Sequence, residues 1–103
     1  MQGWNMSGIS DEERDFIRHA LGLTRTKVGY RNYYAAGGED VLIGYELVAK
    51  GMAVEWPSSK YREGTNFSIT SAGFNAAKLE GEVMDPAETW AMERIDRRLK
   101  AAE

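Results

Sequence analysis

The sequence predicts an α+β fold in which three to four helices accompany a two-stranded antiparallel β-hairpin. Apolar residues recur at helical spacing in residues 11–21, in residues 39–50 and again near the C-terminus. Between the second and third helical segments the period changes to two, which is typical of strands. Capping residues and glycines lie at the ends of these segments, as helix boundaries require.

Composition indicates one globular domain. The chain has 103 residues, of which 43% are hydrophobic and 28% are charged, enough for a single modest core. Its net charge of −3 gives no overall attraction to nucleic acid. The lack of cysteine excludes disulfides and thiolate chemistry. No apolar run approaches the ~20 residues of a membrane span, and the N-terminus does not resemble a signal peptide. We therefore expect a cytoplasmic protein without membrane contact.

The first helix is predicted over residues 11–21. Ser10 is placed to cap it, and Glu13 three residues later can complete a capping box. Gly22 supplies a left-handed residue that ends the helix, and Leu23 then folds back as a hydrophobic contact.

Residues 24–38 show no helical period and form an aromatic loop that contains Tyr30, Tyr33 and Tyr34. A short strand through residues 30–35 is compatible with these aromatic side chains. Two interpretations stay open: two of the three tyrosines cover the core, or the loop is a surface site.

The second helix is predicted over residues 39–50, between Gly38 and Gly51. Its apolar residues extend over such a broad arc that we expect the helix to pack on two sides at the centre of the fold. Gly44 weakens the helix by about 1 kcal/mol relative to alanine, unless close packing requires a glycine there.

The hairpin follows directly. Met52, Val54 and Trp56 alternate with less apolar residues until Pro57, and Phe67 with Ile69 marks the returning strand. The polar loop between the strands carries Lys60, Tyr61 and Arg62 at its tip.

Two further helices complete the chain. Thr70 caps a short helix over residues 71–79, which is expected to lay Phe74, Ala77 and Leu79 on the core. The last helix begins at Asp85, with Pro86 at its first helical position, and runs to the C-terminus. Its apolar stripe comprises Ala87, Ala91, Ile95, Leu99 and Ala102, with Trp90 and Met92 beside the stripe. This helix packs either on its own domain or on a partner, and Trp90 is a candidate anchor.

Four basic residues near the end of the last helix have ordinary explanations. They favour the negative end of the helix dipole, and Glu93 has the i,i+4 spacing for an ion pair with Arg97. The four are Arg94, Arg97, Arg98 and Lys100.

The segments L-V-x-x-G-M (47–52) and F-S-I-T-x-x-G (67–73) resemble a run found in many bacterial and phage winged-helix proteins. The chain is also similar to small uncharacterised phage and prophage proteins with an Arg-Asn-aromatic loop, here residues 31–34. The resemblance covers about two-thirds of the chain and implies a winged-helix-like domain at residues 10–81. We expect residues 1–9 to form a flexible N-terminus and residues 82–103 a C-terminal helix that packs on this domain or on a partner. The sequence departs from a helix-turn-helix because no clear helix lies between residues 23 and 39, directly before the second predicted helix.

No pattern indicates catalysis, a cofactor or a metal site. His19 is the only histidine and has no cysteine to share a metal, so a structural role is favoured. Gly37 and Gly38 precede a helix, but Glu39 and Asp40 follow at once and would repel an anion. We therefore expect a protein that is not an enzyme.

The first hypothesis for function is protein–protein interaction, with the chain itself or with a host factor. The candidate interface residues are Trp90, Tyr33, Tyr34 and Tyr61. The alternative is a winged-helix transcriptional regulator whose phosphate contacts would be Arg25, Lys27, Arg31, Lys60 and Arg62. The acidic start of the second helix disfavours DNA. A virion or assembly component is a third possibility.

Overall fold

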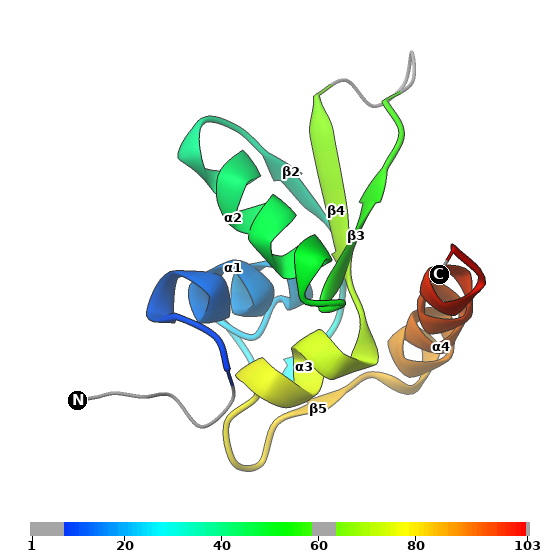
Figure 1. Cartoon of the computed structure of the whole chain (residues 1–103). Coiled ribbons are helices and arrows are strands. Elements are labelled where there is room, and N and C mark those ends of the chain that lie inside the picture. Colours follow the sequence, from blue (N-terminus) through cyan, green and yellow to red (C-terminus); the bar gives the residue numbers. More distant parts are fainter. Residues whose placement is uncertain (1–7, 59–63, 103) are drawn as a thin grey trace.

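Four helices and a small antiparallel sheet make up the chain in its computed structural model, which describes residues 8–58 and 64–102 (Figure 1). The elements in order are α1 (Asp11–Leu21), β1 (Val28–Gly29), β2 (Tyr34–Ala36), α2 (Glu39–Ala49), β3 (Ala53–Trp56), β4 (Thr65–Ile69), α3 (Ser71–Ala77), β5 (Val83–Met84) and α4 (Pro86–Ala102). The predicted α+β class is confirmed.

The sheet has three strands in the order β2-β4-β3, all antiparallel. The predicted hairpin is confirmed as β3 and β4, with Val54 opposite Ser68. A third strand joins this hairpin, because β2 pairs with the other edge of β4 through Tyr34 and Phe67; the short strand expected through residues 30–35 lies slightly later, at Tyr34–Ala36. β2 has only three residues, too few for an alternating pattern to show in the sequence.

A second, parallel pairing joins β1 to β5 and places Val28 opposite Val83. Next to it, the guanidinium of Arg18 on α1 forms an ion pair with Glu82. These contacts tie residues 82–84 to the body of the fold. These residues lie just after the expected boundary between residues 81 and 82.

α1 follows its sequence signals. Ser10 accepts a hydrogen bond from the Glu13 amide at 3.0 Å, and the Ser10 amide donates to the Glu13 carboxylate at 2.8 Å. Gly22 has a φ of 81°, and Leu23 is buried. Ile9, directly before the cap, is 2% exposed and belongs to the core.

The core lies between α1, α2, α3 and the sheet. Phe67 on β4 is fully buried, and Phe16 on α1 meets its ring edge-on at 5.7 Å between centroids. The core also includes Ile17, Ala20, Leu21, Leu47, Ala53, Ile69, Ala77, Met84 and Met92.

The connection from α1 to α2 contains no helix, since residues 22–38, all of them described, hold only turns, loops and the strands β1 and β2. The helix that would precede the recognition helix of a helix-turn-helix is therefore absent from this segment.

α2 forms as predicted, but its expected packing on two sides was wrong. Only Gly44 and Leu47 are buried. Leu42 is 63% exposed and Tyr45 is 43% exposed. The face that packs on the core also carries the half-buried Ile43 and Val48, whereas Leu42 and Tyr45 lie outside it, so the broad apolar arc is buried only in part.

Gly44 is required by close packing. A Cβ atom at this position would lie 2.4 Å from the ring of Phe67, which has no room to move because it is fully buried. We expect Gly44→Ala to lower the free energy of unfolding by about 1–3 kcal/mol, the usual cost of overpacking, despite the better helix propensity of alanine. Gly37→Ala is the control, because a Cβ there meets nothing within 4 Å. Urea denaturation of both variants makes the comparison, and a stabilised Gly44→Ala protein would contradict the packing argument.

The last two helices differ from prediction in detail. α3 ends at Ala77, and Leu79 is 53% exposed and does not lie on the core. On α4 the buried side chains are Met92 and Ile95. Met92 was expected beside the apolar stripe, but it reaches the core because α4 docks on a face turned toward α3 and β4.

Candidate interaction surfaces

The candidate surface residues Tyr33 and Tyr34 are half-buried, and their hydroxyl groups are bound within the fold. Tyr33 donates a hydrogen bond to the buried amide oxygen of Asn66. The ring of Tyr34 stacks on Phe16 with 4.3 Å between centroids, and its hydroxyl donates to Asp40 at 2.6 Å. These two tyrosines serve to join β2 to its neighbours.

The hydrogen bond to Asp40, together with burial, raises the pKa of Tyr34 to about 12. The phenol therefore stays protonated at any physiological pH. It acts as a fixed donor that holds the carboxylate of Asp40 in the first turn of α2.

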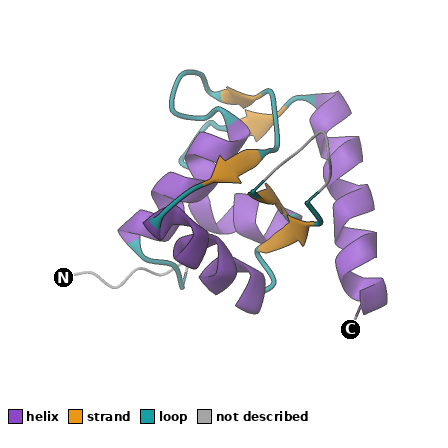
Figure 2. Cartoon of the chain, turned by 90° about the horizontal axis from the view of Figure 1, so that it is seen from above, coloured by secondary structure: helices purple, strands orange, loops and turns teal. Residues whose placement is uncertain are grey.

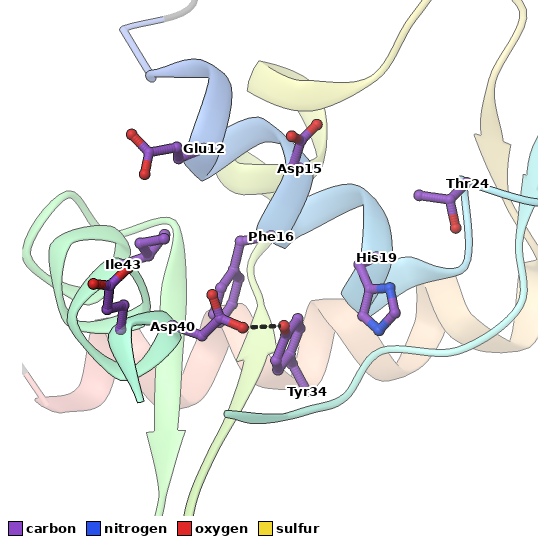
Figure 3. Close-up of a pocket in the computed structure, with 9 residues that line it drawn as sticks. Glu12, Asp15, Phe16, His19, Thr24, Tyr34, Asp40 and Ile43 are labelled. Carbon is purple, nitrogen blue, oxygen red and sulfur yellow. Dashed lines mark hydrogen bonds between the residues drawn. The ribbon is translucent and has the colours of Figure 1, made fainter. Parts of the chain in front are cut away.

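Next to Tyr34 is an open hollow of 410 Å³ between α1 and the start of α2 (Figure 3). Its lining residues are Glu12, Asp15, Phe16, His19, Thr24, Tyr34, Glu39, Asp40 and Ile43. The imidazole of His19 lies 5.0 Å from the Tyr34 ring between centroids. Within the described residues, no group of three or more His, Asp or Glu side chains could hold a metal ion.

Of the candidate phosphate contacts, the group in the aromatic loop (Arg25, Lys27 and Arg31) is only partly available to a ligand. Arg25 and Lys27 are exposed in the turn after α1. The guanidinium of Arg31 instead donates to the carbonyl oxygen of His19 at 2.7 and 3.2 Å, where it satisfies the C-terminal end of α1. The other two candidate phosphate contacts, Lys60 and Arg62, lie outside the described residues, as does the candidate interface residue Tyr61.

α4 carries the most exposed aromatic residue that the structure describes, Trp90, at 60% exposure. The guanidinium carbon of Arg94 lies 5.1 Å from the Trp90 ring centroid. One turn further on, Arg98 lies 4.9 Å from the ring centroid of Trp56 on β3. Trp56 is held by a hydrogen bond of 2.7 Å from its indole nitrogen to Ser68. The result is a row of two arginine–tryptophan pairs, Arg94 with Trp90 and Arg98 with Trp56.

This row borders an open groove of 470 Å³ between α4 and the hairpin, hereafter the Trp–Arg groove. Both views of the chain show α4 at one side of the fold, next to β3 and β4 (Figure 1, Figure 2). The groove is lined by Trp56, Ala91, Arg94, Ile95 and Arg98.

Sequence reasoning did not identify Arg94 and Arg98 as site residues. The spacing of Trp90, Arg94 and Arg98 at intervals of four was an available signal, because residues i and i+4 are neighbours on a helix. The contact of Arg98 with Trp56 had no local signal. The predicted pair of Glu93 with Arg97 is not formed: among the residues described, the ion pairs are Arg18–Glu82 and Lys50–Glu13.

None of the helices in residues 8–58 and 64–102 combines the length and apolarity needed to cross a bilayer.

Comparisons of the chain with protein families, with curated protein sequences and with solved structures found no match.

Proposed function

We propose that this chain is a small non-enzymatic binding domain of phage type that acts in the cytoplasm through a protein partner, either a second copy or a host factor. The observation that carries the proposal is the exposure of Trp90 beside Arg94 on α4. Tryptophan and arginine are enriched among the residues that dominate the energetics of protein interfaces.

The surroundings of Trp90 support this proposal. Asp96 on the same helix accepts hydrogen bonds from the amide of Ser71, at 2.9 Å, and from its hydroxyl, at 2.5 Å. These bonds fix α4 against the N-terminus of α3. A partner would therefore meet a preorganised surface and would not have to order the helix on binding.

A second exposed apolar surface lies on α2. Leu42 projects into solvent, and the hydroxyl of Tyr45 lies 3.3 Å from the Glu55 carboxylate on β3. Glu39 and Asp40 begin the same helix. An apolar face bordered by carboxylates suits a protein contact better than a phosphate backbone.

The test of the proposal is Trp90→Ala. We expect association to weaken about tenfold or more, the size of effect that an interface anchor produces. The midpoint of thermal unfolding should hardly change, because the side chain is already largely in solvent. Sedimentation velocity over a range of concentrations measures self-association, and capture from bacterial lysate on immobilised protein measures a host partner.

Val83→Ala is the matched control, because Val83 is similarly exposed, at 55%, but lies on β5. Equal losses of association in both variants would indicate nonspecific hydrophobic association of the surface. A large loss of stability in Trp90→Ala would show a structural role and contradict the proposal.

DNA binding as a winged-helix regulator is the second candidate. It is favoured by the sheet order β2-β4-β3 with a hairpin directly after α2, which resembles a winged helix, and by the exposed Arg25 and Lys27. The acidic first turn of α2 counts against it. This candidate requires affinity for duplex DNA that falls steeply with salt. A virion component is a third candidate, and detection of the chain in purified particles would separate it from the others.

A further inference from the structure

We propose that the Trp–Arg groove binds an acidic protein segment, in which carboxylates alternate with small or apolar side chains. This inference rests on the proposed function, since it specifies the chemistry of the protein partner. Its two essential groups are the guanidiniums of Arg94 and Arg98.

Both guanidiniums are positioned but lack a counter-charge. Each lies over a tryptophan ring, at 5.1 Å for Arg94 and 4.9 Å for Arg98. Neither forms an ion pair with any carboxylate in the described part of the chain. A guanidinium that lies over an aromatic ring keeps N–H groups available to donate, and carboxylates bind to such groups in pairs.

The spacing of the two groups suits an extended segment. Residues four apart on a helix are separated by about 6 Å along its axis. Alternate residues of an extended chain lie about 6.6 Å apart and point to the same side. Two carboxylates at positions i and i+2 can therefore reach Arg94 and Arg98 together. The residue between them points to the opposite wall, where Trp56 offers apolar surface.

Nucleic acid fits this groove less well. One face of each tryptophan ring is already covered by an arginine of the same chain, so a base could stack there only by displacing it.

A second copy is also a poor occupant. Among the described residues, Glu12, Asp15, Glu39 and Asp40 line an acidic hollow between α1 and α2, and it is concave. The Trp–Arg groove is concave as well. Two hollows cannot fill one another, so the complementary charges of two copies would not meet in close contact.

The test is a fluorescence anisotropy titration with a labelled peptide that repeats Glu-Leu-Glu-Ser. Two further peptides carry glutamine or lysine in place of glutamate, and a labelled single-stranded oligonucleotide is the fourth probe. The full chain is compared with Arg94→Glu, Arg98→Glu and Arg97→Glu. Arg97→Glu is the matched control, since it makes the same charge change on α4 outside the groove.

We expect the glutamate peptide to bind, with a loss of about tenfold or more in Arg94→Glu and Arg98→Glu and less than about twofold in Arg97→Glu. Thermal melts check that the variants fold, and Arg98→Gln replaces Arg98→Glu if the reversed charge disturbs Trp56. An equal loss in Arg97→Glu would reduce the effect to general electrostatics and overturn the assignment to the groove.

The remaining outcomes separate the inference from the proposed function. If the glutamine or lysine peptide binds as well as the glutamate peptide, the acidic chemistry is wrong but a protein partner stands. If none of the probes binds, the inference is overturned, and the Trp90→Ala experiment still decides the proposed function. If only the oligonucleotide binds, with the same loss in Arg94→Glu, both the inference and the protein-binding function fail.

Discussion

Replacing Glu82 with alanine is expected to lower the free energy of unfolding by about 3 kcal/mol, because it leaves the guanidinium of Arg18 largely buried without its counter-charge. The side chains of Arg18 and Glu82 are only 14% and 7% exposed. Arg18 donates two hydrogen bonds to Glu82, one of them at 2.7 Å, and the amide of Leu79 donates a third at 2.7 Å. Glu80→Ala, a change at an exposed neighbour, is the control for urea denaturation.

The same pair makes stability depend on pH. The hydrogen bond from Arg18 holds the pKa of Glu82 below its ordinary value of 4.5, although burial acts in the opposite direction. Since the folded-state pKa is the lower one, the contribution is complete above the unfolded value and is lost as pH falls through the folded value. Wild-type protein should therefore lose stability below about pH 4.5 more steeply than Glu82→Gln. Parallel curves for the two proteins would contradict this role of Glu82.

Replacing Asn32 with alanine is expected to cost about 2–4 kcal/mol, since it unpairs two backbone groups of a fully buried residue. The Asn32 side chain donates to the Ile69 carbonyl at 2.9 Å and accepts from the Ile69 amide at 2.7 Å. It thereby extends the pairing of β2 with β4 beyond Tyr34 and Phe67.

Asn75→Ala is the control, because Asn75 is exposed on α3. Asn32→Asp gives a sharper test: the carboxylate can still accept from the Ile69 amide, but it has no N–H for the carbonyl. It should be destabilised by a similar amount. If either Asn32 variant unfolds at the wild-type urea concentration, the carboxamide does not hold the strand.

The sequence predicts those elements of the fold that are determined by residues close together in the chain. The cap of α1 needs only Ser10, Glu13 and Gly22, all within one helix length, and all three behave as predicted. The third strand of the sheet depends instead on Asn32 and Tyr34 meeting β4. That is a contact between distant parts of the chain, and no periodic pattern in the sequence predicts it.

The exposure of the candidate site residues likewise depends on contacts between distant parts of the chain. For Tyr33 and Tyr34 the sequence left open whether they cover the core or form a surface site, and in the structure Asn66 and Asp40 take up both hydroxyl groups. Apolar composition alone could not separate an exposed side chain from a buried one: Trp90 and Met92 are two residues apart, but one is in solvent and the other in the core. Only the docking angle of α4 decides between them.

The pairing of β1 with β5 has a consequence for the order of folding. Met84 and Met92 belong to the same core as Ile17 and Leu21, so the first helix cannot complete its packing until the last fifth of the chain is available. On the ribosome, α1 and the hairpin would therefore wait as an open intermediate with exposed apolar surface. Docking of β5 and α4 would close the core in one late, cooperative step. A nascent chain arrested before Glu82 should accordingly be a better substrate for chaperones than the full-length chain.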